Sequence, residues 1–164
     1  MFSIGDLIVH PMHGAGVIDD IVREKVAGVW KEYYVFKMPV GGLVLKIPTA
    51  NAGAIGVRGI LSRDEVRALL EAVPGLPVES TANWNKRHQE NLLRLKSGDL
   101  YEVARVVKSL MHLERQRGQS TGERKMLHNA KQIMLSEIAL VESCEYGEIE
   151  IRLDRAMLQV PAAQ

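Results

Sequence analysis

The sequence predicts an α+β protein of two domains, a small antiparallel β-barrel followed by an all-α helical domain. Over the first sixty residues, short runs of β-branched and aromatic residues alternate with turn residues, which is typical of strands. From Ser62 onward, apolar residues recur at helical spacing instead. A proline-marked linker, Pro74 to Thr81, follows the first helix. We therefore expect a β domain over residues 1–59, a connecting helix and linker over 60–80, and a helical domain over 81–160.

Five strands are expected in the first domain. They are Ile4–Val9, Gly16–Val26, Trp30–Met38, Leu43–Ile47 and a short last strand near Ala54–Val57. Ala27-Gly28 and Gly41-Gly42 are dipeptides typical of hairpin turns. About five strands are just enough to enclose a core, so their even spacing favours a small antiparallel barrel.

The expected helices have recognisable start signals. They begin at Ser62, Trp84, Asp99, Ser120 and Glu148. Ser62 with Glu65 and Ser120 with Glu123 have the spacing of capping boxes, in which a serine and a glutamate each satisfy a free backbone amide. Asn83 is a suitable N-cap for the helix that contains Trp84. These signals give the second domain four helices after the linker.

The composition is that of an ordinary globular protein, with 164 residues, 46% hydrophobic and 25% charged. Cys144 is the single cysteine, which excludes an internal disulfide framework. The first residues do not resemble a signal peptide, and no apolar run is long enough to span a bilayer. We expect a cytoplasmic monomer with no membrane partner.

Two histidines close together in the first turn, His10 and His13, suggest a metal site, but no third ligand lies near them in the sequence. We therefore expect no metal and no other cofactor. The chain also has no nucleophile elbow, phosphate-binding loop or dinucleotide fingerprint. We expect that the protein is not an enzyme.

A net charge of +1 conceals an uneven distribution along the chain. Residues 1–78 carry eight basic and eight acidic side chains, whereas residues 86–131 carry eleven basic and five acidic ones. A charge excess is often only a solvated face, but a basic surface also suits a polyanion such as nucleic acid.

Trp84 is the most informative residue of the basic segment. Lys86 and Arg87 follow it within one helical turn, and Arg87 and Arg94 project along nearly one line, about 60° around the helix from the indole. Trp84 also lies at helical spacing from Leu92, as a core residue would. The pattern leaves two interpretations open, a buried tryptophan or an exposed aromatic wedge for nucleic acid.

The chain resembles the bacterial CarD/CdnL transcription regulators along essentially its whole length. The resemblance rests on Phe2–Gly14, Lys31–Tyr34, Asn83–Trp84 with Lys86–Arg87, Asn91–Leu92, Ser97–Asp99 and Gly122–Leu127. The order and spacing of these segments matter more than any one of them.

This resemblance implies a Tudor-like domain, similar to that of transcription-repair coupling factors, which binds the RNA polymerase β subunit. It also implies a helical domain that contacts promoter DNA at the upstream edge of the transcription bubble and stabilises the open complex on the nucleoid. The expected DNA-binding residues are Trp84, Asn85, Lys86, Arg87 and Arg94. The expected polymerase contacts are Arg23, Glu24, Val26 and Lys46.

Two positions depart from the family pattern. Lys86 stands where arginine is expected, and Glu24 lies in a hairpin where relatives often carry a basic residue. Two other classes of function remain open. An RNA- or ribosome-associated module would stack Trp84 on a single-stranded base, and a purely structural scaffold would bury it.

Overall fold

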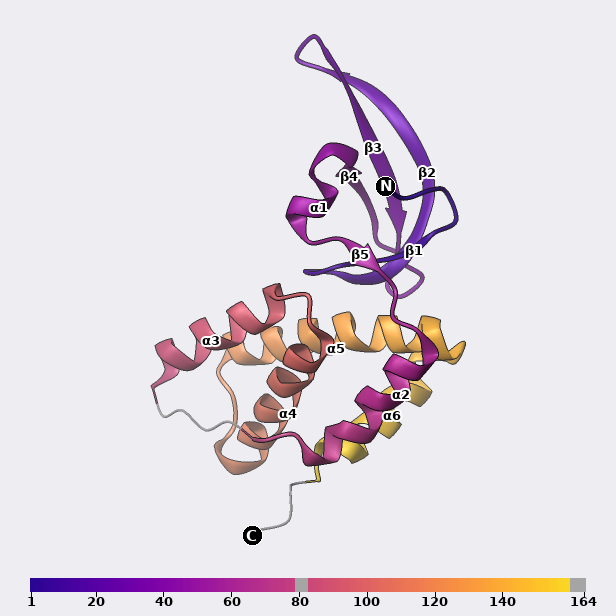
Figure 1. Cartoon of the computed structure of the whole chain (residues 1–164). Helices are drawn as coiled ribbons and strands as arrows, with labels where there is room; N and C mark the ends of the chain where they lie inside the picture. Colours follow the sequence, from indigo (N-terminus) through magenta and orange to yellow (C-terminus); the bar gives the residue numbers. More distant parts are fainter. Residues whose placement is uncertain (79–82, 160–164) are drawn as a thin grey trace.

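The computed structural model describes residues 1–78 and 83–159. It shows an α+β fold in which a five-stranded antiparallel sheet is followed by a group of helices (Figure 1). The predicted boundary between linker and helical domain, at residues 80 and 81, lies outside the described residues. The predicted end of the helical domain at residue 160 also lies outside them. Within them, no helix is both long and apolar enough to cross a membrane.

The sheet has the strand order β4-β3-β2-β1-β5. Its strands are β1 (Leu7–His10), β2 (Gly14–Val26), β3 (Val29–Lys37), β4 (Val44–Pro48) and β5 (Arg58–Gly59). This order leaves β4 and β5 as the two edges, so a closed barrel stays a prediction. Phe36, Ile8 and Ile18 are fully buried in the hydrophobic core of the sheet.

The prediction of a strand over Ala54–Val57 is wrong. A short 3-10 turn (Thr49–Asn51) and the helix α1 (Ala52–Ile55) occupy this region, and the last strand follows at Arg58. Alanine favours helix, and Gly56 ends the turn in the left-handed conformation that glycine adopts at little cost, with φ +97°. The first strand also begins later than expected, because the amide of Ser3 donates to the Asp6 carboxylate and forms a turn.

The β2–β3 hairpin extends beyond the rest of the sheet (Figure 1). Strand β4 pairs with β3 only from Lys37 back to Tyr33. Residues 29–32 of β3 therefore pair with β2 on one side and with no strand of the described chain on the other. The Glu32 carbonyl accepts a hydrogen bond from the Thr49 hydroxyl at 3.4 Å, so the free backbone edge is confined to residues 29–31.

The helices after the sheet begin where the start signals predicted, or within about one turn of it. They are α2 (Arg63–Ala72), α3 (Trp84–Lys96), α4 (Leu100–Arg117), α5 (Thr121–Glu142) and α6 (Tyr146–Met157), with a 3-10 turn over Val73–Gly75. Both capping boxes are formed. Helix α2, expected only as a connection, contributes Val66 and Leu69 to the core shared by all these helices, and the 3-10 turn after it contributes Val73.

The sheet is joined to α5 by buried polar contacts. Arg58 donates two hydrogen bonds to the carboxylate of Glu137, at 2.7 and 2.8 Å, and the amide of Leu61 donates to the same carboxylate at 2.9 Å. Glu137 is fully buried. At β2, the amide of Ala15 donates to the Ser136 hydroxyl at 3.0 Å. These contacts fix the sheet against the helices.

Candidate nucleic-acid interface

Trp84 lies in the first turn of α3, where the start of α5 meets it. Its indole is 41% exposed, which does not fit the scaffold interpretation of a buried tryptophan. The indole N–H donates to the hydroxyl of Ser120 at 3.2 Å. One face of the indole stacks on the His88 ring, with centroids 4.8 Å apart and planes inclined by 12°. The side chain is thus held in place and still presents surface to solvent.

The N-terminus of α3 has electrostatic properties that suit an anion. The Asn83 side chain accepts a hydrogen bond from the amide of Lys86, as the sequence predicted. Helices α2, α4, α5 and α6 each have an acidic residue in the first turn, whereas α3 has none. No acidic side chain in the first turn of α3 itself therefore offsets the partial positive charge at the start of this helix.

Of the expected DNA-binding residues, Asn85 and Lys86 are exposed beside Trp84. Lys86 forms no ion pair within the part of the chain that the structure describes. It lies about 200° around α3 from Trp84, so the two side chains flank the helix end from different sides. A nucleic acid that touches both would have to straddle the start of α3.

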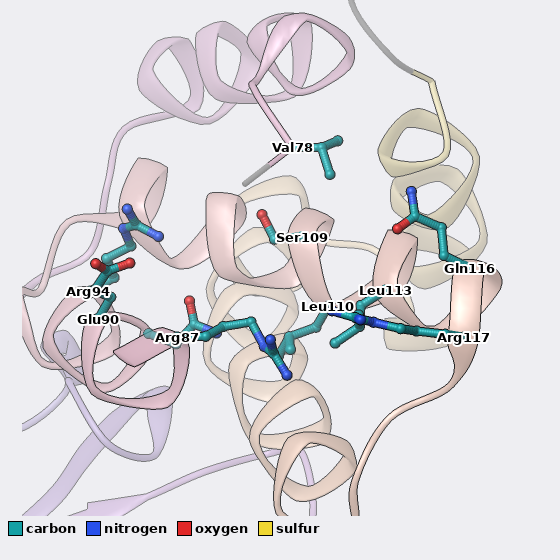
Figure 2. A pocket seen from close by; sticks show the side chains of 10 residues that line it. Val78, Arg87, Glu90, Arg94, Ser109, Leu110, Leu113, Gln116 and Arg117 are labelled. Atoms are coloured by element: carbon teal, nitrogen blue, oxygen red, sulfur yellow. The ribbon is translucent and has the colours of Figure 1, made fainter. Parts of the chain in front are cut away.

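The two expected arginines are engaged by acidic side chains. Arg87 donates to the Glu123 carboxylate at 2.9 Å, and Arg94 lies 3.3 Å from the carboxylate of Glu102. Their side chains are only 14% and 18% exposed. Both line a narrow pocket between α3 and α4, together with Arg117 (Figure 2). They do share a line on α3, as predicted, but this line faces neighbouring helices, so they hold α3 in place.

Glu123 is the partner that sequence reasoning did not assign to the site. It is 4% exposed and lies in the first turn of α5. Burial raises its pKa, but hydrogen bonds from Arg87 and from the backbone of Ser120 outweigh this and hold the pKa of Glu123 below its usual value. The carboxylate therefore stays ionised and keeps α3 attached to α5.

One further basic residue, Lys125, reaches this region from α5. Lys125 is exposed, and Gly122 lies against the indole, whereas Arg124 lines a hollow with Tyr146 and Glu150 of α6. Lys125 is three residues beyond Gly122 and so lies on the same face of α5. The sequence shows the start of α5 through its capping box, but it does not show that this start lies beside Trp84.

The expected polymerase contacts lie on the hairpin and on β4. Glu24 on β2 forms an ion pair with Lys46 on β4. The Arg23 guanidinium lies 6.0 Å from the centre of the Trp30 ring. Since side chains alternate along a strand, Arg23 lies on one face of the hairpin. Glu24 and Val26 both lie on the opposite face, where Glu24 is in register with Lys31 and Val26 with Val29.

The sequence did not single out Trp30, which is 60% exposed near the hairpin turn. Val29 beside it is 58% exposed. The signal in the sequence was an aromatic residue close to the predicted turn at Gly28. The alternating pattern of a strand does not show which of its two faces is covered by the rest of the protein, so it does not predict that Trp30 is exposed.

His10 and His13 lie with ring centres 4.7 Å apart. The Nδ1 atom of His10 accepts a hydrogen bond from the amide of Met12 at 3.1 Å. Burial and the neighbouring His13 both lower the pKa of His10. Among the described residues, no group of three potential metal ligands is found.

Comparison with known families accounts for both parts of the chain. Residues 66–154 match the family described as "CarD, C-terminal domain", and residues 2–61 match "CarD-like/TRCF RID domain". The chain belongs to the CarD family. The chain is also similar to a protein of Bacillus subtilis (strain 168) named "Putative transcription factor YdeB". The two sequences are 29% identical over 150 residues, which cover 92% of this chain and 98% of the relative.

Membership of the CarD family makes the chain a transcription regulator. The C-terminal match begins at residue 66, within α2. It therefore includes the helix that packs into the core of the helical part.

Proposed function

We propose that this protein binds RNA polymerase through its sheet and stabilises the open promoter complex by inserting Trp84 at the upstream edge of the transcription bubble. The observation that carries the proposal is the half-exposed indole in the first turn of a helix without acidic residues there. The division of labour follows the two parts of the fold, with the sheet of residues 1–59 for polymerase and the helices for DNA.

The energy required of Trp84 is small. An opened duplex exposes unstacked bases, and an indole that contacts them favours the open form over the closed one. A tenfold increase in the open population needs about 1.4 kcal/mol, and stacking of one base on an aromatic residue contributes roughly 1–3 kcal/mol. One tryptophan is therefore sufficient, and no base sequence needs to be read.

The charges around the indole suit the sugar-phosphate backbone on both sides of it. Lys86 flanks the start of α3, and Lys125 flanks it from α5. A lysine suits a phosphate as a point charge, so replacement of the expected arginine by Lys86 preserves this role. Asn85 is exposed next to Lys86 and contributes a polar contact. Arg87 and Arg94 act indirectly, because they fix α3 against its neighbours.

The polymerase β subunit binds at the far end of the sheet in this proposal. The free edge of β3 over residues 29–31 is able to pair with a strand of a partner, and exposed Val29 and Trp30 supply apolar contact. Arg23, Glu24, Val26 and Lys46 surround this edge with charges of both signs and one apolar side chain. Attachment to polymerase raises the local concentration of the helices at DNA, so weak phosphate contacts are enough.

The test is the lifetime of open complexes formed by RNA polymerase on one promoter, with the full chain or with a variant added. Trp84→Ala should shorten the lifetime by about five- to 150-fold, the range that one stacked base allows. Tyr101→Ala is a matched control, because Tyr101 also lies in the first turn of a helix and is 40% exposed.

Equal lifetimes with the Trp84→Ala and Tyr101→Ala chains would contradict the proposal. Loss of single-stranded RNA binding in Trp84→Ala, with no effect of the chain on promoter complexes, would instead favour an RNA-binding module.

A further inference from the structure

We propose that Ser120 and Glu123 of α5 are positioning residues for Trp84, which hold the indole in the orientation that enters DNA. This inference rests on the proposed function of Trp84. It assigns to the start of α5 a role beyond that of a helix cap.

The Ser120 hydroxyl uses its full hydrogen-bonding capacity at this point. It accepts hydrogen bonds from the Trp84 indole N–H at 3.2 Å and from the amide of Glu123 at 3.2 Å, and it donates to the Glu123 carboxylate at 3.2 Å. A hydroxyl has one donor and two acceptor positions, so all three are occupied. The other two hydrogen bonds therefore fix the orientation of the hydroxyl, and with it the direction from which the indole N–H donates.

Glu123 in turn is anchored to the helix that carries the tryptophan. Its two carboxylate oxygens accept from Arg87 at 2.9 and 3.3 Å, and Arg87 lies three residues after Trp84 on α3. The chain of contacts thus leaves α3 at Trp84, passes through Ser120 and Glu123 on α5, and returns to α3 at Arg87. A closed network of this kind restrains every member more than isolated pairs would.

The other neighbours of the indole, His88 and Gly122, leave one edge of the ring exposed to a binding partner. His88 covers one ring face by stacking. A Cβ atom at Gly122 would lie 3.8 Å from Cζ2 of Trp84, so the glycine leaves this edge uncovered where a larger side chain would cover it. The indole is held at its N–H and on one face, and its exposed part points away from both.

The other capping box shows what helix capping alone requires. Ser62 accepts from the amide of Glu65 at 3.1 Å, and Glu65 is exposed. No aromatic residue donates to Ser62 within the described part of the chain. The same S-x-x-E motif therefore caps α2 without an indole or an arginine from another helix, which makes these additional contacts particular to α5.

Holding the indole in advance reduces the entropy that is lost when it binds. One hydrogen bond of ordinary net strength corresponds to about a two- to tenfold effect on an equilibrium. Removal of the Ser120 hydroxyl should therefore shorten the open-complex lifetime by about two- to tenfold, less than removal of Trp84 itself.

The experiment compares Ser120→Ala with Ser62→Ala, since both changes remove the serine of a capping box. Mobility of Trp84 is measured by acrylamide quenching and fluorescence anisotropy in a Trp30→Phe chain, where Trp84 is the only tryptophan because the protein has two. Open-complex lifetime is measured with Trp30 present. We expect that Ser120→Ala increases quenching, lowers anisotropy and shortens the lifetime, that Ser62→Ala changes none of these, and that Ser120→Thr, which keeps the hydroxyl, restores them.

Unchanged quenching and anisotropy in Ser120→Ala, or equal changes in Ser62→Ala, would overturn the inference even if Trp84→Ala shortens the lifetime. A change in fluorescence confined to Ser120→Ala, with no effect of Trp84→Ala on lifetime, would instead overturn the proposed function. The two failures are therefore distinguishable.

Discussion

The two tryptophans of this protein lie far apart and have different surroundings, although both are exposed. Trp30 is near the tip of the β2–β3 hairpin, beside a free strand edge and charges of both signs (Figure 1). Trp84 stands at the start of α3, in a first turn that has no acidic residue of its own, and beside exposed basic residues. A mixed surface with free backbone groups suits a protein strand, and a surface whose exposed charges are basic suits phosphates. The exposure of the two tryptophans alone would not show that they suit different partners.

The two sites are also held differently. Trp84 is fixed by Ser120 and His88, whereas Trp30, on a projecting hairpin, has the Arg23 guanidinium 6.0 Å from its ring centre. The sheet that carries Trp30 is tied to α5 through Arg58 and Glu137. If the protein has to place one site on polymerase and the other on DNA, this connection determines their relative position.

The largest effect is expected from Glu137→Ala, which breaks the connection between the two regions. Arg58 and the amide of Leu61 would lose their shared acceptor, and we expect a loss of about 3 kcal/mol in the free energy of unfolding, because Arg58 is only partly rehydrated. Denaturant unfolding measures it. Glu114→Ala, an exposed glutamate on α4, is the control. A loss below about 1 kcal/mol would show that this contact does not fix the sheet.

A somewhat smaller effect is expected from Gly14→Ala at the same junction. Gly14 has φ +117°, and a Cβ atom there would lie 2.3 Å from the Ser136 hydroxyl oxygen, which must then move away from Ala15. We expect destabilisation of about 2 kcal/mol. Gly28→Ala is matched, since Gly28 also has positive φ but open space around it, and it should cost about 1 kcal/mol. Equal thermal unfolding of the two variants would contradict close packing at the junction.

Next in size is the salt dependence of the promoter complex. Lys86→Ala should reduce the slope of log affinity against log salt by about 0.9, because one phosphate contact is lost. Lys37→Ala, at an exposed lysine of β3 that is assigned no contact, should leave the slope unchanged. Arg87→Ala should mainly lower stability, because it leaves the buried Glu123 carboxylate without its arginine. If Arg87→Ala reduced the slope and Lys86→Ala did not, the roles of these two residues would have to be exchanged.

The smallest effect concerns pH. The pKa of Glu123 is lower in the folded protein than its usual value of 4.5, so its ion pair stabilises the fold fully above that value. The stabilisation is lost as the pH falls from 4.5 through the lowered pKa. The difference in unfolding free energy between the natural chain and Glu123→Gln should therefore be constant near neutral pH and decrease below pH 4.5. A difference that grows on acidification would contradict the assigned sign.

Local signals predicted much of the fold. The capping residues Ser62, Asn83 and Ser120 each start a helix as expected, because capping depends on residues within one turn. The prediction of a strand near Ala54 was wrong because the local signal there was weak. A run of four residues is too short for its period to separate strand from helix, and alanine with a following glycine decided for helix.

The candidate site was less accessible to sequence reasoning. Helical spacing correctly placed Arg87 and Arg94 on one line, but it does not say which neighbour covers that line, and here Glu123 and Glu102 do. The contact between Trp84 and Ser120 joins residues 36 positions apart, and only the packing of α3 on α5 creates it. Side-chain partners of this kind depend on tertiary structure and not on local pattern.

The most direct test of the account is a crossed measurement with Trp30→Ala and Trp84→Ala, each assayed for binding to the isolated polymerase β subunit and for open-complex lifetime at saturating protein. We predict that Trp30→Ala weakens β-subunit binding by about 30-fold, as loss of an interface hot spot does, yet restores the full lifetime once saturated. Trp84→Ala should bind the β subunit normally and shorten the lifetime at every concentration. If both variants lose the same activity, or if Trp84→Ala loses β-subunit binding, the separation of the two surfaces is wrong.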